Sequence, residues 1–360
     1  MQIADNFSGN TESRFLYEQQ LVPVFQNKVY NSREEAEKAL KGKVELVQSP
    51  VSGFVYNRLF QPDLMVYDIN YQNEQSNSQV FKDHLQSVLD LLISRGIKEK
   101  KVVEIGCGKG VLFEMMLQNG IDCWGFDPTY EGTNPRVIKE YFGDEYNDID
   151  AGLVIMRHTL EHIPNPFSFI HTIAKANKYK GYIFVEVPTF DWIIKKEAYW
   201  DIFYEHCNYF NEQSLGCMFE DAVTGSFFGD QYIYLWADLS KIRKTIPAQD
   251  FTFYNADAFR KKMKEHEALL REKGPVIIWG AGGKGSTFLN LMDSKRNYIS
   301  YVVDINPLKQ GKFIAGTGHP IYSPERLKTE PPRTIIIMNE NYRKEIMEMV
   351  NIPGINFISI

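Results

Sequence analysis

Residues 101–127, KVVEIGCGKGVLFEMMLQNGIDCWGFD, decide the fold that this chain is expected to adopt. The apolar residues Val102, Val103 and Ile105 indicate a strand of a buried parallel sheet, and a helical pattern follows it after a short turn. The turn contains Gly106, Gly108 and Gly110, whose missing side chains permit a tight bend and let a ligand approach the main chain. The helix that follows presents free N–H groups at its start. The stretch is therefore typical of an α/β domain that binds a nucleoside.

A carboxylate completes this unit. A second apolar run, 123–126, ends in Asp127, at the tip of the neighbouring strand, where it can accept hydrogen bonds from ribose hydroxyls. A dinucleotide loop has the form G-x-G-x-x-G and holds a pyrophosphate, whereas residues 104–110 are EIGCGKG. A glycine turn without a ligand would leave Asp127 unexplained. We therefore expect a nucleoside ligand without a pyrophosphate.

The loop resembles motif I of the class I S-adenosylmethionine-dependent methyltransferases, including the acidic residue two places before the first glycine. The resemblance implies that S-adenosylmethionine is the cofactor and that Asp127 holds its ribose. The cofactor-binding residues that it implies on this loop are Glu104, Gly106, Gly108 and Gly110.

Length and composition narrow the class of protein further. A chain of 360 residues predicts two or three domains, and a net charge of −6 without long Lys/Arg runs argues against nucleic acid as a partner. No apolar stretch has the length of a membrane span and the N-terminus lacks a leader pattern, so we expect a cytoplasmic protein. The four cysteines lie far apart, which predicts reduced, mostly buried thiols: Cys107, Cys123, Cys207 and Cys217.

The N-terminal region, 1–75, contains a helical signal at 32–40 between short extended pieces. Residues 44–78, VELVQSPVSGFVYNRLFQPDLMVYDINYQNEQSNS, resemble the N-terminal region of the sugar C-methyltransferase family, in which two C-x-x-C pairs bind zinc. The matching positions here are Val22, Phe25, Ser49 and Ser52. Zinc requires thiolate or imidazole ligands, so we expect no metal and a module held by apolar packing.

Two tyrosines, Tyr67 and Tyr71, stand in a polar and aromatic segment too irregular for a plain helix. They either pack the junction between domains or, as the family resemblance implies, donate hydrogen bonds to a substrate oxygen. A helix is expected over 81–95, and the domain boundary near Ser76.

Histidines follow the next buried strand, 151–156, in the segment RHTLEHIP. Ligands of open parallel sheets bind beyond the carboxyl ends of the strands, so these side chains are expected at the site. The sequence LEHIP recurs in class I methyltransferases. We expect His158 to contact the cofactor and His162 to act in catalysis, although either ring can serve a structural role instead.

Residues 199–210, YWDIFYEHCNYF, follow the strand at 182–187 and concentrate aromatic rings around the pair Glu205 and His206. The segment resembles the glutamate-histidine segment of the sugar C-methyltransferases, in which the histidine is the proposed base. That resemblance assigns His206 as base and Glu205 as the carboxylate that orients it, since imidazole titrates near neutral pH. The alternative is a histidine buried in an aromatic core. Residues 231–237 predict an antiparallel strand that ends the sheet.

The C-terminal region begins with an amphipathic helix, 257–273, and a strand, 275–279. A glycine loop follows in the G-x-G-x-x-G pattern, and taken alone it would predict a dinucleotide. Strands are expected only near Val276, Val302, Ile335 and Phe357, which makes half of a Rossmann fold, as in the C-terminal domain of the sugar C-methyltransferases. We expect the loop to hold a diphosphate of the acceptor through Gly280, Gly282, Lys284 and Gly285.

The sequence thus predicts an α/β protein: a Rossmann-like methyltransferase domain, 76–240, between a small N-terminal domain, 1–75, and a C-terminal half-Rossmann domain, 241–360. The expected reaction is methyl transfer to a small, nucleotide-linked sugar, next to a keto group. His206 removes the proton, and Tyr67, Tyr71 or His162 stabilises the enolate oxygen. Alternatives are O-methylation, a sugar reductase that binds NAD(P) at the C-terminal loop, and a sugar-binding protein without a base.

Overall fold

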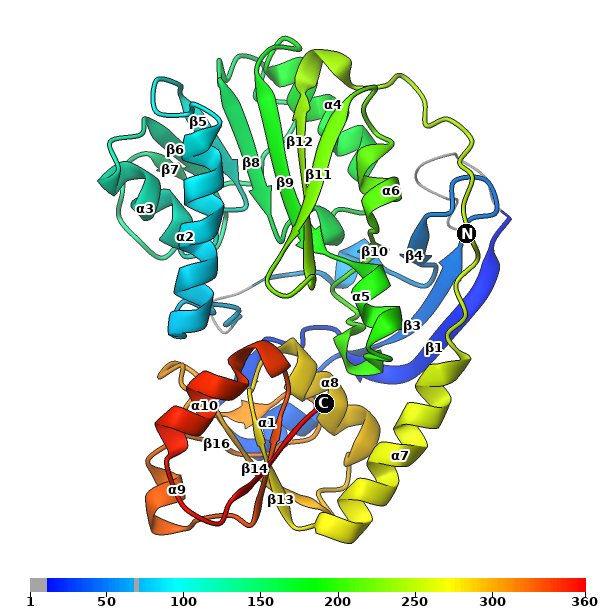
Figure 1. The fold of residues 1–360 in the computed structure, drawn as a ribbon, viewed down its shortest axis with the longest axis vertical. Helices are drawn as coiled ribbons and strands as arrows, with labels where there is room; N and C mark the ends of the chain where they lie inside the picture. Colours follow the sequence, from blue (N-terminus) through cyan, green and yellow to red (C-terminus); the bar gives the residue numbers. More distant parts are fainter. Residues whose placement is uncertain (1–11, 68–70) are drawn as a thin grey trace.

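The computed structural model describes residues 12–67 and 71–360. The expectation for the leader region at 1–11, and that for part of the segment between the two tyrosines, 68–70, lie outside the described residues. Figure 1 shows an upper α/β domain, a lower α/β domain that contains the C-terminus, and a small antiparallel sheet beside them. Within the described part of the chain, no helix has the length and apolar character that crossing a bilayer requires.

The upper domain is built on a seven-stranded sheet with the order β11-β12-β9-β8-β5-β6-β7. Strands β7, β6, β5, β8 and β9 are parallel neighbours, and β12 runs antiparallel to β9, as the sequence predicted. The prediction that this strand ends the sheet is wrong, because β11 pairs with its outer edge. The Rossmann-like fold is therefore confirmed. The strands are β5 (Val102–Ile105), β6 (Cys123–Phe126), β7 (Val137–Ile138), β8 (Leu153–Arg157), β9 (Tyr182–Pro188), β11 (Ala222–Phe227) and β12 (Tyr232–Asp238).

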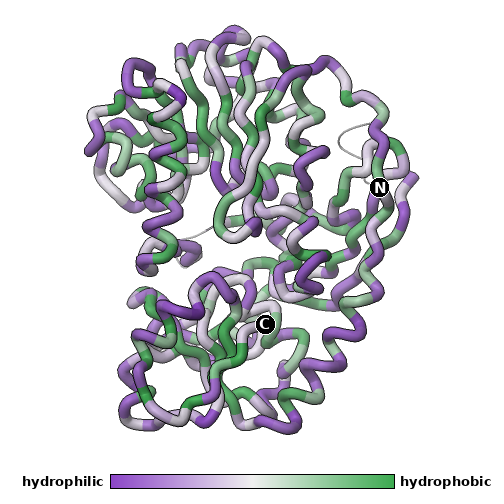
Figure 2. The backbone as a smooth tube through the Cα atoms, in the orientation of Figure 1, coloured by the Kyte–Doolittle hydropathy of each residue, from purple (hydrophilic) through white to green (hydrophobic). Residues whose placement is uncertain are grey.

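Helices cover both faces of this sheet because successive strand residues point to opposite sides. Val102 packs with the helices α2 and α3, and Val103 packs with α4 and α6 on the other face. Figure 2 shows hydrophobic residues concentrated in the strands between these layers. The helices are α2 (Gln79–Ser94), α3 (Val111–Gln118), α4 (Pro166–Ala176), α5 (Phe190–Lys195) and α6 (Glu212–Gly216), with short 3-10 turns η2 (Leu160–His162) and η3 (Tyr199–Asp201).

The lower domain has a five-stranded sheet with the order β16-β14-β13-β17-β18, all parallel. Four of its strands were predicted; β16 was missed because two residues are too few for a pattern. The strands are β13 (Val276–Trp279), β14 (Ile299–Val303), β16 (Ile321–Tyr322), β17 (Thr334–Ile337) and β18 (Asn356–Ser359). The helices are α7 (Asp257–Lys273), α8 (Gly283–Met292), α9 (Arg326–Thr329) and α10 (Arg343–Val350), and turns η4 (Leu239–Lys241) and η5 (Glu340–Tyr342) precede α7 and α10.

The N-terminal sheet joins the other two units by hydrogen bonds. Its order is β1-β3-β4-β10, so its last strand comes from the upper domain, and β2 pairs with β15 of the lower domain. The helix predicted at 32–40 is shorter, because residues from Lys41 onward enter a strand. The elements are β1 (Arg14–Pro23), β2 (Val29–Tyr30), α1 (Arg33–Glu37), β3 (Lys41–Gln48), β4 (Val55–Asn57), η1 (Pro62–Leu64), β10 (Asn208–Tyr209) and β15 (Phe313–Ile314).

The four positions that match zinc ligands are buried in this N-terminal unit. Val22 and Phe25 belong to its hydrophobic core. Ser49 Oγ accepts hydrogen bonds from the N–H groups of Val51 and Ser52, so it closes a turn. The ring of Phe25 contacts Tyr67 and Tyr71 edge to face, with centroids 5.1 and 6.0 Å away. Apolar packing thus reaches from this unit to the two tyrosines.

We expect protein purified without added metal to contain no stoichiometric zinc in this unit, because none of these side chains is a zinc ligand. Elemental analysis measures this directly. One zinc per chain that survives mild chelation, and that is still bound when all four cysteines have been substituted, would contradict the prediction.

All four cysteines are free; Cys217 is half-buried and the others are buried.

Candidate functional site

A cavity of about 640 Å³ lies where the three units meet. Its wall includes the glycine loop after β5, the histidines after β8, the segment before β10, and the glycine loop after β13. Its volume is in the usual range of small-molecule sites. The structure therefore brings residues of both predicted ligand sites into a single cavity.

The first glycine loop has the backbone that its sequence predicted. Gly106, Gly108 and Gly110 have φ angles of 76°, 56° and 82°, in the left-handed region that favours glycine. A Cβ atom at Gly106 would overlap the hydroxyl of Thr159. The loop therefore approaches the segment after β8 closely, and only a main chain without side chains fits there.

Asp127 accepts hydrogen bonds from this loop. Its Oδ2 accepts one from the N–H of Gly108 at 2.8 Å, and its Oδ1 accepts two from Thr129, both at 2.7 Å. The carboxylate therefore orders the loop while it lines the cavity. Oδ2 has a further lone pair, so Asp127 can also accept a hydrogen bond from a ribose hydroxyl.

Glu104 lies beneath the loop, almost fully buried. Burial raises its pKa to about 7, against the opposing effect of Arg157. Its Oε2 atom is buried without a hydrogen-bond partner among the described residues. An orphaned carboxylate oxygen beside a glycine-rich loop fits a ligand that has both a donor group and a nucleoside, as S-adenosylmethionine does.

His158 stands in a strained position at the end of β8, with a φ of 48°. It lies 3.7 Å from Glu161 and 3.9 Å from Glu186, and its ring packs on Tyr232. Glu186 also pairs with Arg157 at 2.6 Å and with His84 at 2.9 Å. Burial opposes ionisation of Glu186, but these partners hold its pKa far below its usual range.

Sequence reasoning missed this network around Glu186. The available signal was a single carboxylate inside the apolar strand YIFVEVP, since a charge at such a position requires a buried partner.

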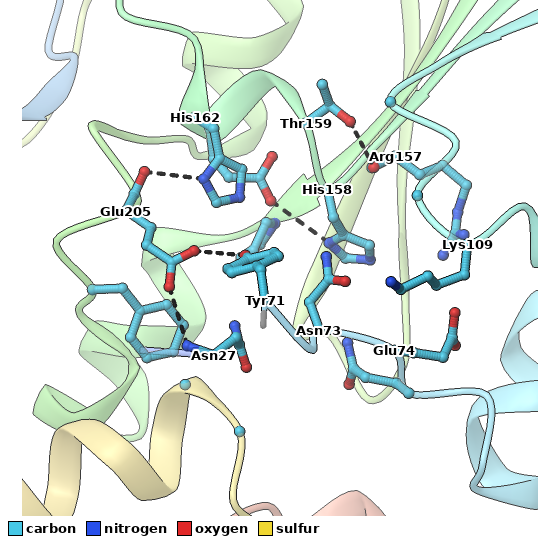
Figure 3. Close-up of a pocket in the computed structure, with 18 of the residues that line it drawn as sticks. Asn27, Tyr71, Asn73, Glu74, Lys109, Arg157, His158, Thr159, His162 and Glu205 are labelled. Carbon is cyan, nitrogen blue, oxygen red and sulfur yellow. Dashed lines mark hydrogen bonds and ion pairs between the residues drawn. The ribbon is translucent and has the colours of Figure 1, made fainter. Parts of the chain in front are cut away.

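His162 and His206 face each other across the cavity wall, with ring centroids 4.8 Å apart and nearly perpendicular planes. His162 Nδ1 lies 3.0 Å from the carbonyl oxygen of Glu205 and 3.4 Å from the hydroxyl of Tyr67, and Figure 3 shows the first of these contacts. A carbonyl only accepts, so Nδ1 carries the proton and Nε2 of neutral His162 keeps its lone pair.

The predicted partnership of Glu205 and His206 is wrong in its geometry. Glu205 Oε1 accepts hydrogen bonds from the N–H groups of Gln26 and Asn27, at 2.7 and 3.4 Å. Its Oε2 accepts one from the hydroxyl of Tyr71 at 2.6 Å (Figure 3). Among the described residues its carboxylate makes no hydrogen bond to His206. Adjacent side chains outside a helix diverge, so one points to the N-terminal unit and the other to η2.

Three further groups in the site have shifted pKa values. Burial and the neighbouring His162 lower the pKa of His206 to about 3, so its ring is neutral at ordinary pH. Burial and the charge of Glu205 raise the pKa values of Tyr67 and Tyr71 well above 10. Both tyrosines therefore keep their protons, but that of Tyr71 is already donated to Glu205.

The second glycine loop repeats the design of the first. Asp304, after β14, accepts a hydrogen bond from the N–H of Ala281 at 2.7 Å, as Asp127 does from Gly108. Gly280 has a φ of 114°, and a Cβ at Gly285 would overlap the carbonyl oxygen of Gly280. Gly280, Gly282 and Gly285 all line the cavity.

Lys284 does not offer the free charge that was expected of it. Its ammonium pairs with Asp201 of η3 at 3.0 Å and lies 4.3 Å from the ring centroid of Trp192. The reason is tertiary: α8 begins against η3, so the nearest anion belongs to the upper domain. Lys284 therefore joins two domains, and its charge is already compensated.

Sequence reasoning missed a second lysine beside this loop. Lys309 is only 4% exposed, lines the cavity and donates to the carbonyl of Ala281 at 3.2 Å. Burial lowers its pKa, while Asp304 and Glu205 favour its charged form. Asn306 is 3% exposed, and its Nδ2 has no hydrogen-bond partner among the described residues. These buried donors favour a ligand rich in oxygen.

Two sets of side chains in the described part of the chain bring three histidine or carboxylate ligand atoms within 4.8 Å of one another. The first set is His84, His158 and Glu186, and the guanidinium of Arg157 contacts both His84 and Glu186. The second is Glu161, His162 and His206. Such a set can bind either a proton or a divalent cation.

Comparisons with known proteins agree with this architecture. Residues 76–222 match the family described as Methyltransferase domain, and residues 243–356 match the family described as C-methyltransferase C-terminal domain. C-methyltransferase NovU of Streptomyces niveus is 26% identical over 331 residues, which cover 81% of this chain and 78% of NovU.

Other matches cover less than half of this chain. A ubiquinone biosynthesis O-methyltransferase of Yersinia enterocolitica is 32% identical over 116 residues, 27% of this chain and 46% of that enzyme. The structure of the Burkholderia thailandensis 1,6-didemethyltoxoflavin-N1-methyltransferase is 15% identical, with a TM-score of 0.34, and covers 46% of this chain and 82% of that one. Neither acceptor is carried over to this protein.

The sheet order, the loop geometry and the first match define a methyltransferase that depends on S-adenosylmethionine. The second match adds a domain of the C-methyltransferase C-terminal kind, and the similarity to NovU extends over most of the chain.

Proposed function

We propose that this enzyme methylates a carbon next to the carbonyl group of a small, nucleotide-linked sugar, with His206 as the base. The observation that carries the proposal is the position of the two facing imidazoles, His162 and His206, in the wall of the cavity that both glycine loops line. A methyl donor on the first loop and an acceptor anchored near the second would meet close to these rings.

The protonation states of the site support this chemistry. A carbon next to a carbonyl is acidic enough for a positioned imidazole to deprotonate, and His206 is in the neutral form that accepts a proton. Tyr67 keeps its proton and lies beside His162, so its hydroxyl suits the enolate oxygen better than that of Tyr71. When bound, S-adenosylmethionine supplies an electrophilic methyl group whose C–S bond breaks as the new C–C bond forms.

Proton exchange tests the proposal directly. The enzyme, with S-adenosylhomocysteine and a nucleoside-diphosphate-linked keto-hexose in deuterated water, should replace the hydrogen next to the carbonyl by deuterium. NMR of the sugar measures the exchange. Methyl transfer to a hydroxyl without any exchange would favour an O-methyltransferase instead, and the same base would then serve a different acceptor atom.

We further propose that the acceptor's diphosphate binds beside Lys309 and Asn306 at the second glycine loop. The buried ammonium of Lys309 donates to the carbonyl of Ala281, and Nδ2 of Asn306 has no acceptor among the described residues, while the start of α8 adds main-chain donors. Phosphate oxygens would satisfy these groups. In this proposal the lysine that binds the diphosphate is Lys309, whereas the sequence had predicted Lys284.

Lys309→Gln should raise the KM of the nucleotide-linked acceptor by about 10- to 100-fold, because a charge-assisted bond to phosphate is lost. Calorimetry should show nearly unchanged affinity for S-adenosylmethionine.

The matched control is Lys284→Gln, which removes the same charge from the pair with Asp201. We expect it to lower the melting temperature and to raise the acceptor's KM much less than Lys309→Gln does. A larger rise in KM for Lys284→Gln than for Lys309→Gln would return the anion-binding role to Lys284.

A further inference from the structure

Glu161 is a carboxylate that the reaction as described does not use. It lies in η2 and is only 2% exposed. Its Oε1 is 3.7 Å from His158 Nδ1, and its ligand atom lies within 4.8 Å of those of His162 and His206. Three imidazoles that reach the cavity wall therefore surround one buried anion.

One of the two carboxylate oxygens of Glu161 makes no hydrogen bond. This atom, Oε2, is buried and has no hydrogen-bond partner among the described residues. Leaving such an acceptor unsatisfied costs on the order of 1–3 kcal/mol. Burial raises the pKa of Glu161, but the bond from His158 and the two other histidines outweigh it and hold the pKa below its usual value. Glu161 is thus an ionised carboxylate that can accept a further hydrogen bond from an N–H group.

The other carboxylates near His206 are already engaged. Glu205 accepts from Gln26, Asn27 and Tyr71, and Glu186 is paired with Arg157 and His84. Among the described residues, the hydroxyl of Tyr67 also lies beside His162, and the thiol of Cys207 donates to the main-chain oxygen of Glu161. None of these offers a negative charge at neutral pH. Glu161 is therefore the carboxylate left to compensate a protonated imidazole.

We propose that Glu161, and not Glu205, is the counter-charge that stabilises the imidazolium formed when His206 takes the acceptor's proton. The inference rests on the proposed function. In the step, the C–H bond next to the carbonyl breaks, its electron pair enters the enolate, and the proton goes to a nitrogen of His206. The imidazolium then has an anion within reach, directly or through the ring of His162. Glu161 touches no reacting atom and is a positioning residue.

The test is Glu161→Gln, which keeps the shape of the side chain and removes its charge. We expect kcat to fall by about 10- to 100-fold, because a weaker base loses part of the advantage of general-base catalysis. The KM of a nucleoside-diphosphate-linked keto-hexose and the affinity for S-adenosylmethionine should change by no more than about twofold. The rate with acceptor deuterated next to its carbonyl should show a larger isotope effect than in the unmodified enzyme, because proton removal becomes slower. Glu161→Asp should regain part of the lost kcat.

The matched control is Glu205→Gln, an identical change at the adjacent carboxylate. Loss of its bonds to Tyr71 and to the turn at 26–27 should raise the acceptor's KM and lower the melting temperature, without a larger isotope effect. An increased isotope effect in Glu205→Gln and none in Glu161→Gln would overturn the inference.

Two other results would also overturn it. One is a Glu161→Gln enzyme with near-normal kcat. The other is loss of turnover by the unmodified enzyme on chelation with recovery on adding a divalent cation, which would make Glu161 a metal ligand. If the unmodified enzyme binds S-adenosylmethionine but neither exchanges nor methylates the keto-sugar, the proposed function has failed instead.

Discussion

His206→Ala is expected to leave both ligands bound and to lower turnover by about 10²–10⁴-fold, the usual contribution of a positioned general base. His206→Gln should be nearly as inactive, because an amide keeps hydrogen bonding but cannot take a proton from carbon. Steady-state kinetics measures the loss of turnover, and calorimetry measures whether the ligands still bind. Deuterium exchange into the acceptor should disappear in both variants.

The matched control for this prediction is Phe203→Leu, next to the same ring, since Phe203 contacts His206 at 4.8 Å between centroids but carries no proton. It should change the packing of the ring and reduce turnover far less than His206→Ala. A His206→Ala enzyme with near-normal turnover would remove the residue from the mechanism. His162, which belongs to the same cluster, would then be the next candidate for the base.

Asp127→Ala is expected to weaken S-adenosylmethionine binding by about 1–3 kcal/mol, roughly 5- to 150-fold in Kd. The loss has two sources: the ribose loses its acceptor, and the N–H groups of Gly108 and Thr129 lose theirs. Calorimetry on the purified protein measures both together.

Thr129→Val separates the two sources. It removes only the hydroxyl bond to Asp127 Oδ1 and keeps the carboxylate, so we expect a much smaller change in affinity. Equal losses in the two variants would show that loop order, and not the ribose contact, determines binding. An unmodified protein that fails to bind S-adenosylmethionine at millimolar concentration would contradict the role assigned to this loop.

Much of the site was predictable because its signals are local. The strand, glycine turn and Asp127 lie within 27 residues, and the hydrogen bond from Gly108 to Asp127 needs only two adjacent parallel strands. The second glycine loop and Asp304 follow the same rule. Left-handed backbone angles favour glycine, so glycines at these spacings indicate such turns directly.

Partner choice among charged side chains was not predictable in the same way. Glu205 precedes His206 in the chain, yet its carboxylate binds a turn nearly 180 residues earlier. Lys284 stands in a glycine loop, yet it pairs with Asp201 of another domain. In both cases proximity along the chain suggested one partner, and the packing of separate domains supplied a nearer one.

The sequence by itself determined the fold class, the two glycine loops and the class of cofactor, because period, glycine geometry and strand ends are properties of short stretches. Only the tertiary structure decided which carboxylate lies among the imidazoles, which lysine lies at the second loop, and that one cavity joins the two loops. Those relations depend on how three units pack, and a buried charge takes the partner that packing brings within a few ångströms, whatever its distance along the chain.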